Sequence, residues 1–291
     1  MPLFRKKSQS QAQRLASWRS EALSGAHAAD GVGALLDDLG ATASEERKGW
    51  VVEAGAGRLF IATIDDGTTL SGWSPIQVTH DTTELLSLLR RNLEPGLVWT
   101  CRSDAGGEDE LGARFAVPLD GFDRGAVLLA LEAMAGALGD EALATRARDV
   151  REPPRGEADE QDAHARAGGA VQAALEAVGL TAEDDPERPG VWRIAVDEGV
   201  VEAVLRDTGE SLLLMRALEY AGGEDDAEAL RWLLLASDWG SARMGMASLP
   251  GGPGLFSVCA VPAAPLEPQA LAWGVGEVLQ LSDEYDRLAG G

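Results

Sequence analysis

The stretch that decides the fold is Asp81-Thr-Thr-Glu-Leu-Leu-Ser-Leu-Leu-Arg-Arg-Asn-Leu93. It predicts a helix, because Asp81 stands where a capping oxygen is needed and Glu84 follows three places later, as in a capping box. Its leucines then cover more than one face of the helix. A helix that is apolar on several sides needs burial on several sides. We therefore expect its own sheet to cover one side and a second body to cover the other.

The same pattern returns in the second half of the chain as Asp225-Asp-Ala-Glu-Ala-Leu-Arg-Trp-Leu-Leu-Leu235. Asp225 and Glu228 follow Asp81 and Glu84 at one spacing of 144 residues (225 − 81 and 228 − 84). At this spacing Trp232 takes the place of Leu88. Further segments match as well, since Ala116-Val-Pro118 recurs as Ala260-Val-Pro262. The chain is therefore interpreted as an internal duplication.

Each half is predicted to contain a helix, three strands, a helix, two strands and a final helix, the final helix of the first half running over 123–146. This order predicts an α+β fold made of two tandem α-β-β-β-α-β-β-α units, each a mostly antiparallel sheet packed with helices. We expect a basic lead-in over 1–27 that is partly helical or disordered, a first domain over 28–146, an acidic, proline-containing linker over 147–167 and a second domain over 168–288.

The two leucine-crowded helices, 81–93 and 225–236, are expected near each other, so that the halves form an intramolecular pseudo-dimer. The residues expected at this inter-domain or partner contact are Leu85, Leu88, Leu89, Leu230, Trp232 and Leu233. Self-association of the whole chain is left open.

The composition is that of a globular protein with an acidic surface. The chain has 291 residues, 45% of them hydrophobic, and a formal net charge of -23. Such a surface repels nucleic acid and anionic lipid and attracts basic partners. Cys101 and Cys259 lie in strand-like runs, as expected for buried reduced thiols of a cytosolic protein. Because no run reaches the apolar length of a membrane span, we expect a cytoplasmic location.

The sequence indicates no catalytic chemistry. The histidines His27, His80 and His164 are scattered and no pair has the spacing of zinc ligands. The motif Gly55-Ala-Gly57 precedes a strand rather than a helix, which indicates a turn and not a phosphate-binding loop. The carboxylates of the two repeated motifs are interpreted as helix caps rather than as an acid–base pair. We expect no enzyme, no cofactor and no metal.

Two segments carry a family resemblance, Glu84-Leu-Leu-Ser-Leu-Leu-Arg-Arg-Asn-Leu93 and Arg114-Phe-Ala-Val-Pro-Leu119. With the order of elements, they resemble YbjN-type domains, which in turn are similar to the class I chaperones of type III secretion. The resemblance implies two YbjN-like domains, a tendency to dimerise, and the binding of other proteins without catalytic residues. The expected function is a chaperone- or adaptor-like protein-binding module in bacterial stress or sensory regulation. Two units fused in one chain depart from the usual single-domain chaperone.

A second hypothesis is a regulatory domain pair that senses a small molecule. It requires an apolar pocket between sheet and helices with a few convergent polar groups. A closed pocket would favour this sensor, and an open apolar groove with an acidic rim would favour the protein-binding module.

Overall fold

The structure is a computed structural model, and it describes residues 28–46, 49–64, 69–76, 81–103, 109–118, 124–151, 168–197, 199–206, 211–220, 222–237, 241–263, 266 and 268–289. The lead-in expected over 1–27 and most of the expected linker lie outside these residues. The described part of the chain forms an α+β fold with two six-stranded antiparallel sheets.

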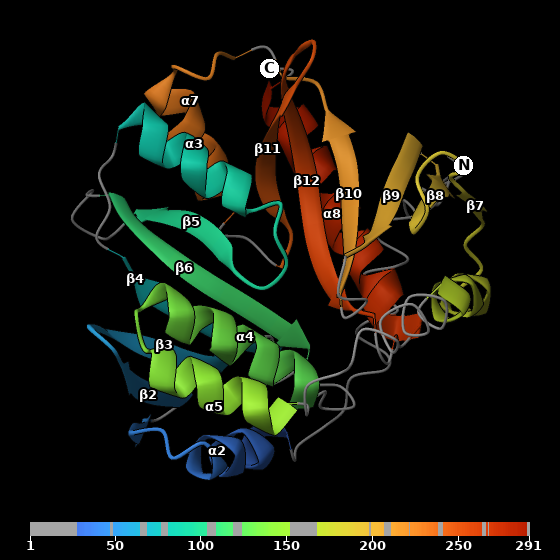
Figure 1. The fold of residues 1–291 in the computed structure, drawn as a ribbon. Helices are drawn as coiled ribbons and strands as arrows, with labels where there is room; N and C mark the ends of the chain where they lie inside the picture. Colours follow the sequence, from blue (N-terminus) through green and yellow to red (C-terminus); the bar gives the residue numbers. More distant parts are fainter. Residues whose placement is uncertain are drawn as a thin grey trace, which may run out of the picture.

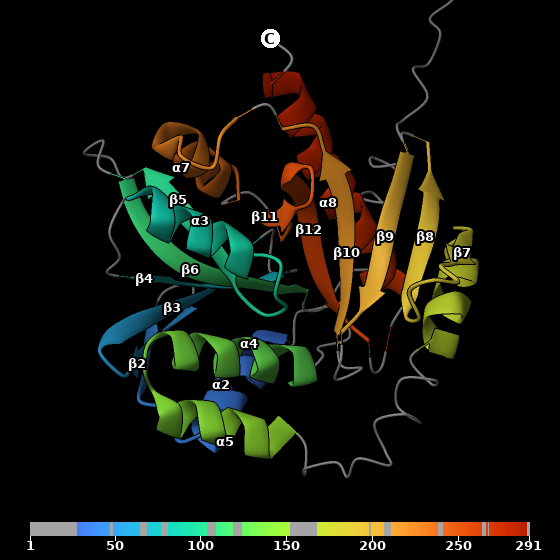
Figure 2. The ribbon, with the colours of Figure 1, turned by 45° about the horizontal axis from the view of Figure 1, so that its top comes forward.

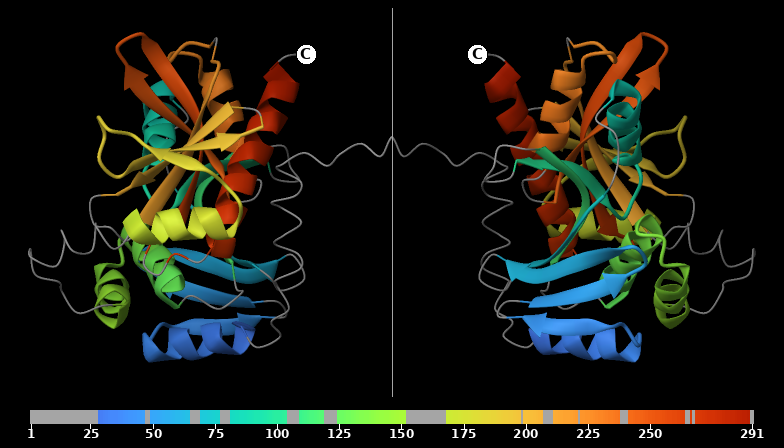
Figure 3. Two further views of the ribbon diagram at one scale, coloured as in Figure 1. Left: turned by 90° about the vertical axis from the view of Figure 1, so that its right-hand side faces the viewer. Right: turned by 90° about the vertical axis from the view of Figure 1, so that its left-hand side faces the viewer.

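The first sheet has the strand order β1-β2-β3-β4-β6-β5. Its strands are β1 (Ala43–Glu46), β2 (Gly49–Ala54), β3 (Gly57–Ile64), β4 (Thr69–Pro75), β5 (Val98–Ser103) and β6 (Asp109–Pro118). Three helices accompany it: α2 (Ala28–Asp38), α4 (Arg124–Ala137) and α5 (Glu141–Arg151). Helix α4 packs on β6 and on α5, and α2 lies beside them at the end of the molecule away from the second sheet (Figures 1 and 3).

The second sheet has the order β7-β8-β9-β10-β12-β11, which repeats the order of the first. Its strands are β7 (Ala182–Asp184), β8 (Val191–Val196), β9 (Gly199–Leu205), β10 (Ser211–Leu218), β11 (Arg243–Leu249) and β12 (Gly252–Pro262). Helix α8 (Pro268–Ala289) packs across β10 and β12. A helical segment over 168–177 opens this half.

The strand registers are repeated as well as the strand order. Leu70 of β4 faces Val117 of β6, and Leu212 of β10 faces Val261 of β12. These pairs are related by the spacings found in the sequence, 142 residues for β4 and β10 and 144 for β6 and β12 (212 − 70 and 261 − 117). A shift of one residue would turn every side chain to the other face of the sheet. The same face is therefore buried in both halves.

The order of elements differs from the prediction in two places. Each sheet has a further edge strand, β1 or β7, so that four strands rather than three precede the middle helix. These strands are short and carry acidic residues, which protects a sheet edge but gives no apolar alternation to recognise. The single helix predicted over 123–146 is two helices, because Gly139 adopts a φ of 75° and Asp140 caps α5 by accepting the Leu143 N–H (2.9 Å).

The middle helices are α3 (Thr82–Arg91) and α7 (Ala227–Ala236). Asp81 caps α3 by accepting the Glu84 N–H (2.9 Å), as the motif predicts. The cap of α7 is Asp226 and not Asp225, because Asp226 accepts the N–H of Ala229 at 3.0 Å. The true spacing of the two helices is therefore 145 residues (226 − 81).

With a spacing of 145 residues, different side chains of the two middle helices are equivalent. The buried leucines of α3 are Leu85, Leu88 and Leu89, and those of α7 are Leu230, Leu233 and Leu234. Leu88 therefore corresponds to Leu233, and Trp232 corresponds to Ser87 rather than to Leu88. The one-residue difference between the spacings of 144 and 145 arises just before α7. Two adjacent aspartates there make either alignment plausible from sequence alone.

Candidate functional site

The two middle helices lie side by side between the sheets, and Figures 1 and 2 show this from two directions. Each helix also contacts the edge strand of the other half. Helix α7 packs on β5 of the first sheet, and α3 packs on β11 of the second sheet. We call this region the junction. At the junction, the middle helix of each half packs on the edge strand of the other half.

The C-caps of the two helices are buried polar residues at equivalent positions, Asn92 and Ser237 (237 − 92 = 145). The Trp99 N–H donates to Asn92 Oδ1 (2.7 Å), and at the matching place the Met244 N–H donates to Ser237 Oγ (2.9 Å). Asn92 makes a further bond across the junction, since its Nδ2 donates to the Met244 carbonyl (2.9 Å). Buried polar groups of this kind are satisfied in both halves.

Two buried arginines connect the halves. Arg243 of the second half donates from Nε to the Asn92 carbonyl (2.7 Å) and from a terminal nitrogen to the Glu94 carbonyl (2.5 Å). Arg114 of the first half donates to the Ser237 carbonyl from Nε (3.1 Å) and from a terminal nitrogen (2.5 Å). Each guanidinium therefore binds the carbonyl end of the other half's helix, where the helix dipole is negative.

The two arginines come from different strands. In the first sheet Val98 of β5 faces Arg114 of β6, whereas in the second sheet Arg243 of β11 faces Val258 of β12. The valine and the arginine have thus changed places within one cross-strand pair. Burial lowers the pKa of Arg243 to about 10, so its side chain is charged at neutral pH. Neither arginine was predicted at a contact, although each follows an alanine and precedes an apolar residue, an unusual place for a charged side chain.

Smaller contacts complete the junction. Thr100 Oγ1 donates to the Leu234 carbonyl (3.1 Å). At the exposed edge, Arg90 donates to Ser248 Oγ (2.9 Å) and lies 3.5 Å from a carboxylate oxygen of Glu224. The Leu93 side chain packs closely over Gly245, where a Cβ would lie 2.6 Å from its Cδ2.

The residues predicted at a contact are placed in two environments. Leu85, Leu88, Leu89, Leu230 and Leu233 are fully buried on the two adjoining helices. Trp232 is only partly buried, and its ring packs against Tyr285 of α8, with ring centroids 5.9 Å apart and planes inclined at 51°.

Trp232 is part of a surface hollow that we call the aromatic hollow, with a volume of about 430 Å³. Its walls come from the segment after β10, the first turns of α7 and the end of α8. It is lined by Tyr220, Asp226, Glu228, Ala229, Trp232, Leu233, Tyr285, Leu288 and Ala289. Sequence analysis named Trp232 but missed Tyr220 and Tyr285, which are far apart in the chain.

The two tyrosines of the aromatic hollow are held by backbone contacts. The Tyr285 hydroxyl donates to the Glu219 carbonyl (2.9 Å), and the Tyr220 hydroxyl donates to the Gly223 carbonyl (3.2 Å). Burial raises the pKa of Tyr220, and the nearby carboxylates, of which Asp226 acts most, raise it further. Burial and then Asp286 raise the pKa of Tyr285. Both phenols are therefore neutral at neutral pH.

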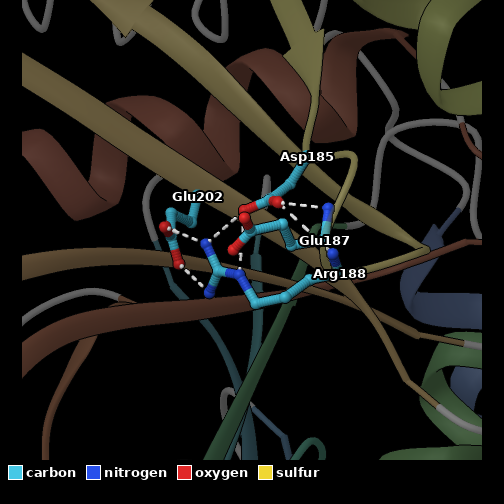
Figure 4. A network of polar contacts seen from close by, with 4 residues as sticks. All are labelled: Asp185, Glu187, Arg188 and Glu202. Atoms are coloured by element: carbon cyan, nitrogen blue, oxygen red, sulfur yellow. Dashed lines mark hydrogen bonds and ion pairs between the residues drawn. The ribbon is translucent and has the colours of Figure 1, made fainter.

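A polar cluster in the turn before β8 and on β9 is drawn in Figure 4. Arg188 donates to both carboxylate oxygens of Glu202 (2.7 and 3.1 Å) and from Nε to Asp185 (2.9 Å). Asp185 also accepts the backbone N–H of Glu187 (3.0 Å). The Arg188 guanidinium, followed by that N–H, lowers the pKa of Asp185. This network is an exposed ion-pair cluster between a turn and a strand.

Within the described ranges, no group of three or more His, Cys, Asp or Glu side chains is placed to hold a metal ion. Both cysteines, Cys101 and Cys259, are buried. None of the described helices is long and apolar enough to cross a membrane.

No protein-family model, no curated protein and no solved structure matches the chain.

Proposed function

We propose that the chain is a non-enzymatic, cytoplasmic protein-binding module of the chaperone or adaptor kind, in which two YbjN-like units form an intramolecular pseudo-dimer. The repeated strand order and register support the two units. The exchanged contacts of α3 and α7 support the pseudo-dimer. The two buried cysteines fit a reducing compartment. The resemblance to YbjN-type domains supports a role in bacterial stress or sensory regulation.

The observation that carries the proposal is the aromatic hollow. Tryptophan and tyrosine are enriched at the centres of protein–protein contacts, because they bury a large area with few rotatable bonds. Here Trp232, Tyr220 and Tyr285 line one hollow together with Asp226 and Glu228, and Trp232 and Tyr220 are partly exposed while Tyr285 is buried. An open apolar surface with an acidic rim is the feature expected of a module that binds proteins.

The proposal is tested by affinity capture with the full chain and with two variants. Trp232→Ala removes the central ring of the aromatic hollow, and Phe60→Ala removes an exposed aromatic side chain that lies elsewhere, on β3. We expect a defined protein to be retained by the wild type and by Phe60→Ala and to be lost from Trp232→Ala. Equal retention by all three chains, or no retained protein, would contradict the proposal.

A second candidate function is a small-molecule sensor. The volume of the aromatic hollow, about 430 Å³, falls within the range of small-ligand sites, roughly 300–1,000 Å³. A thermal-shift screen of small metabolites distinguishes the two functions. The sensor predicts a compound that stabilises the wild type but not Trp232→Ala, together with an empty protein capture.

A further inference from the structure

The aromatic hollow combines rings with negative charge. The rings of Trp232 and Tyr285 are tilted against each other, and Tyr220 lines the same space. The face of an aromatic ring is electron-rich and attracts a cation placed within about 6 Å of its centre, most strongly when the ring is that of tryptophan. Three such rings in one small space favour an organic cation over a neutral apolar group.

The charged groups that line the aromatic hollow also favour a cation. Asp226 and Glu228 supply two carboxylates. The end of α8, at Leu288 and Ala289, adds the partial negative charge of a helix C-terminus. The first turn of α7 has the opposite polarity, but the carboxylate of Asp226 accepts two of its N–H groups at 3.1 and 3.0 Å. Arg287, in the last turn of α8, is paired with Glu284.

The aromatic hollow is not required by the fold, because the first half has the same fold without its key side chains. The position of Trp232 is occupied by Ser87 (232 − 145). The end of α8 has no continuous counterpart, since the equivalent helix is broken between α4 and α5 at Gly139. The rings are therefore particular to the second half, where they pack at the edge of its core.

We propose that the aromatic hollow binds the cationic side chain of a basic residue presented by the partner protein. The inference rests on the proposed function, since it names the chemistry by which the partner is recognised. A guanidinium fits best, because it is planar, stacks on aromatic rings and also binds carboxylates. The formal net charge of -23 brings such a partner to the surface, and the aromatic hollow holds one of its side chains.

The test is an NMR titration of the full chain in which the indole N–H signals are followed. The probes are N-acetyl-L-arginine amide and its neutral isostere N-acetyl-L-citrulline amide. The signal of Trp232 is the one lost in Trp232→Phe. We expect this signal to move and saturate with the arginine probe, and the citrulline probe to bind about tenfold more weakly.

A charge-neutral variant makes the test independent of the aromatic substitution. The double change Asp226→Asn with Glu228→Gln keeps a good N-cap, because asparagine caps as well as aspartate. It should lower the affinity for the arginine probe and leave the citrulline probe unchanged. Equal binding of the two probes, or no movement of the Trp232 signal at any concentration of the arginine probe, would overturn the inference.

The two proposals fail in different ways. Binding of the arginine probe without any captured protein would contradict the protein-binding function and leave the cation site standing. Capture that depends on Trp232, together with equal binding of both probes, would support the protein-binding function and refute the cation site.

Discussion

The first half of the chain, 28–151, and the second half, 168–289, place their strands in one order and one register, yet their surfaces differ. Phe60 on β3 is 44% exposed and lies beside Trp73, with ring centroids 6.5 Å apart. The equivalent of Phe60 is Glu202 (202 − 60 = 142), which is paired with Arg188. The first half thus shows aromatic rings where the second shows an ion-pair network.

The opposite holds in the centre of the middle helix, where Ser87 of the first half corresponds to Trp232 of the second. The two halves thus share the strand order, the register and the contacts of the junction, whereas each half carries aromatic surface at a place of its own. The variants described next either disrupt the junction, which both halves share, or change a feature that only one half has.

The largest effect is expected from the buried leucines of the junction helices. Leu88→Ala and Leu233→Ala should each lower the free energy of unfolding by about 3 kcal/mol, because both side chains are fully buried and leave a cavity. Urea titration measures the loss. Ser87→Ala on the exposed side of α3 is the control and should change stability by less than about 0.5 kcal/mol. A loss below about 1 kcal/mol at either leucine would show that the helices are not equivalently packed.

The exchanged arginines come next. Arg114→Met and Arg243→Met should each cost about 2 kcal/mol, because buried carbonyl oxygens of the other half lose charged donors. The pKa of Arg243 lies at about 10. The residue is therefore charged in both folded and unfolded chains at lower pH, and its cost should be constant between about pH 6 and pH 9.

Arg90→Ala is the matched control for the two arginines, because Arg90 also crosses the junction but is exposed. It should cost less than about 1 kcal/mol, as surface ion pairs do. Unchanged or increased stability of both methionine variants would contradict the role given to the buried arginines.

A smaller effect is expected at Gly245, which corresponds to Thr100 in the first half (245 − 100 = 145). A Cβ at this position would meet Leu93 at 2.6 Å, so Gly245→Ala should cost about 1 kcal/mol by overpacking. Adding Leu93→Ala should remove most of that extra cost, and a double-mutant cycle by urea titration measures this coupling. Simple additivity of the two changes would refute the contact.

The smallest effect is expected in the ion-pair network. The pKa of Asp185 is lowered by Arg188, so the stabilisation is present above the ordinary aspartate pKa and is lost as the pH falls through the lowered one. Thermal unfolding of Arg188→Ala should therefore show a slightly lower midpoint than the wild type near neutral pH and the same midpoint in strong acid. A difference that persists in acid would assign the effect to packing instead.

The α+β class and the repeated order of elements could be predicted because they depend on local signals. The capping motif at Asp81 and the leucines that follow it determine a helix without reference to the rest of the chain. The same motif before α7 was misplaced by one residue, because Asp225 and Asp226 are chemically alike and only the capping hydrogen bonds and the burial seen in the structure distinguish the two alignments. That error placed Trp232 at a core position.

The remaining features could not be predicted because they depend on contacts distant in sequence. The bond from Arg243 to Asn92 joins residues 151 apart, and no local pattern names the carbonyl that the guanidinium will reach. The aromatic hollow depends on where α8 ends relative to the start of α7. The edge strands β1 and β7 are too short and too polar to show a period.

The most direct test of the central claim, that the halves form one body through the junction, is to cut the chain between them. A protease recognition sequence is inserted between 152 and 167, and the cleaved protein is examined by analytical ultracentrifugation at micromolar concentration. We predict that the two halves remain together as a one-to-one complex, and that Arg114→Met with Arg243→Met weakens it. Sedimentation of the cleaved wild-type halves as two separate folded monomers would contradict the account.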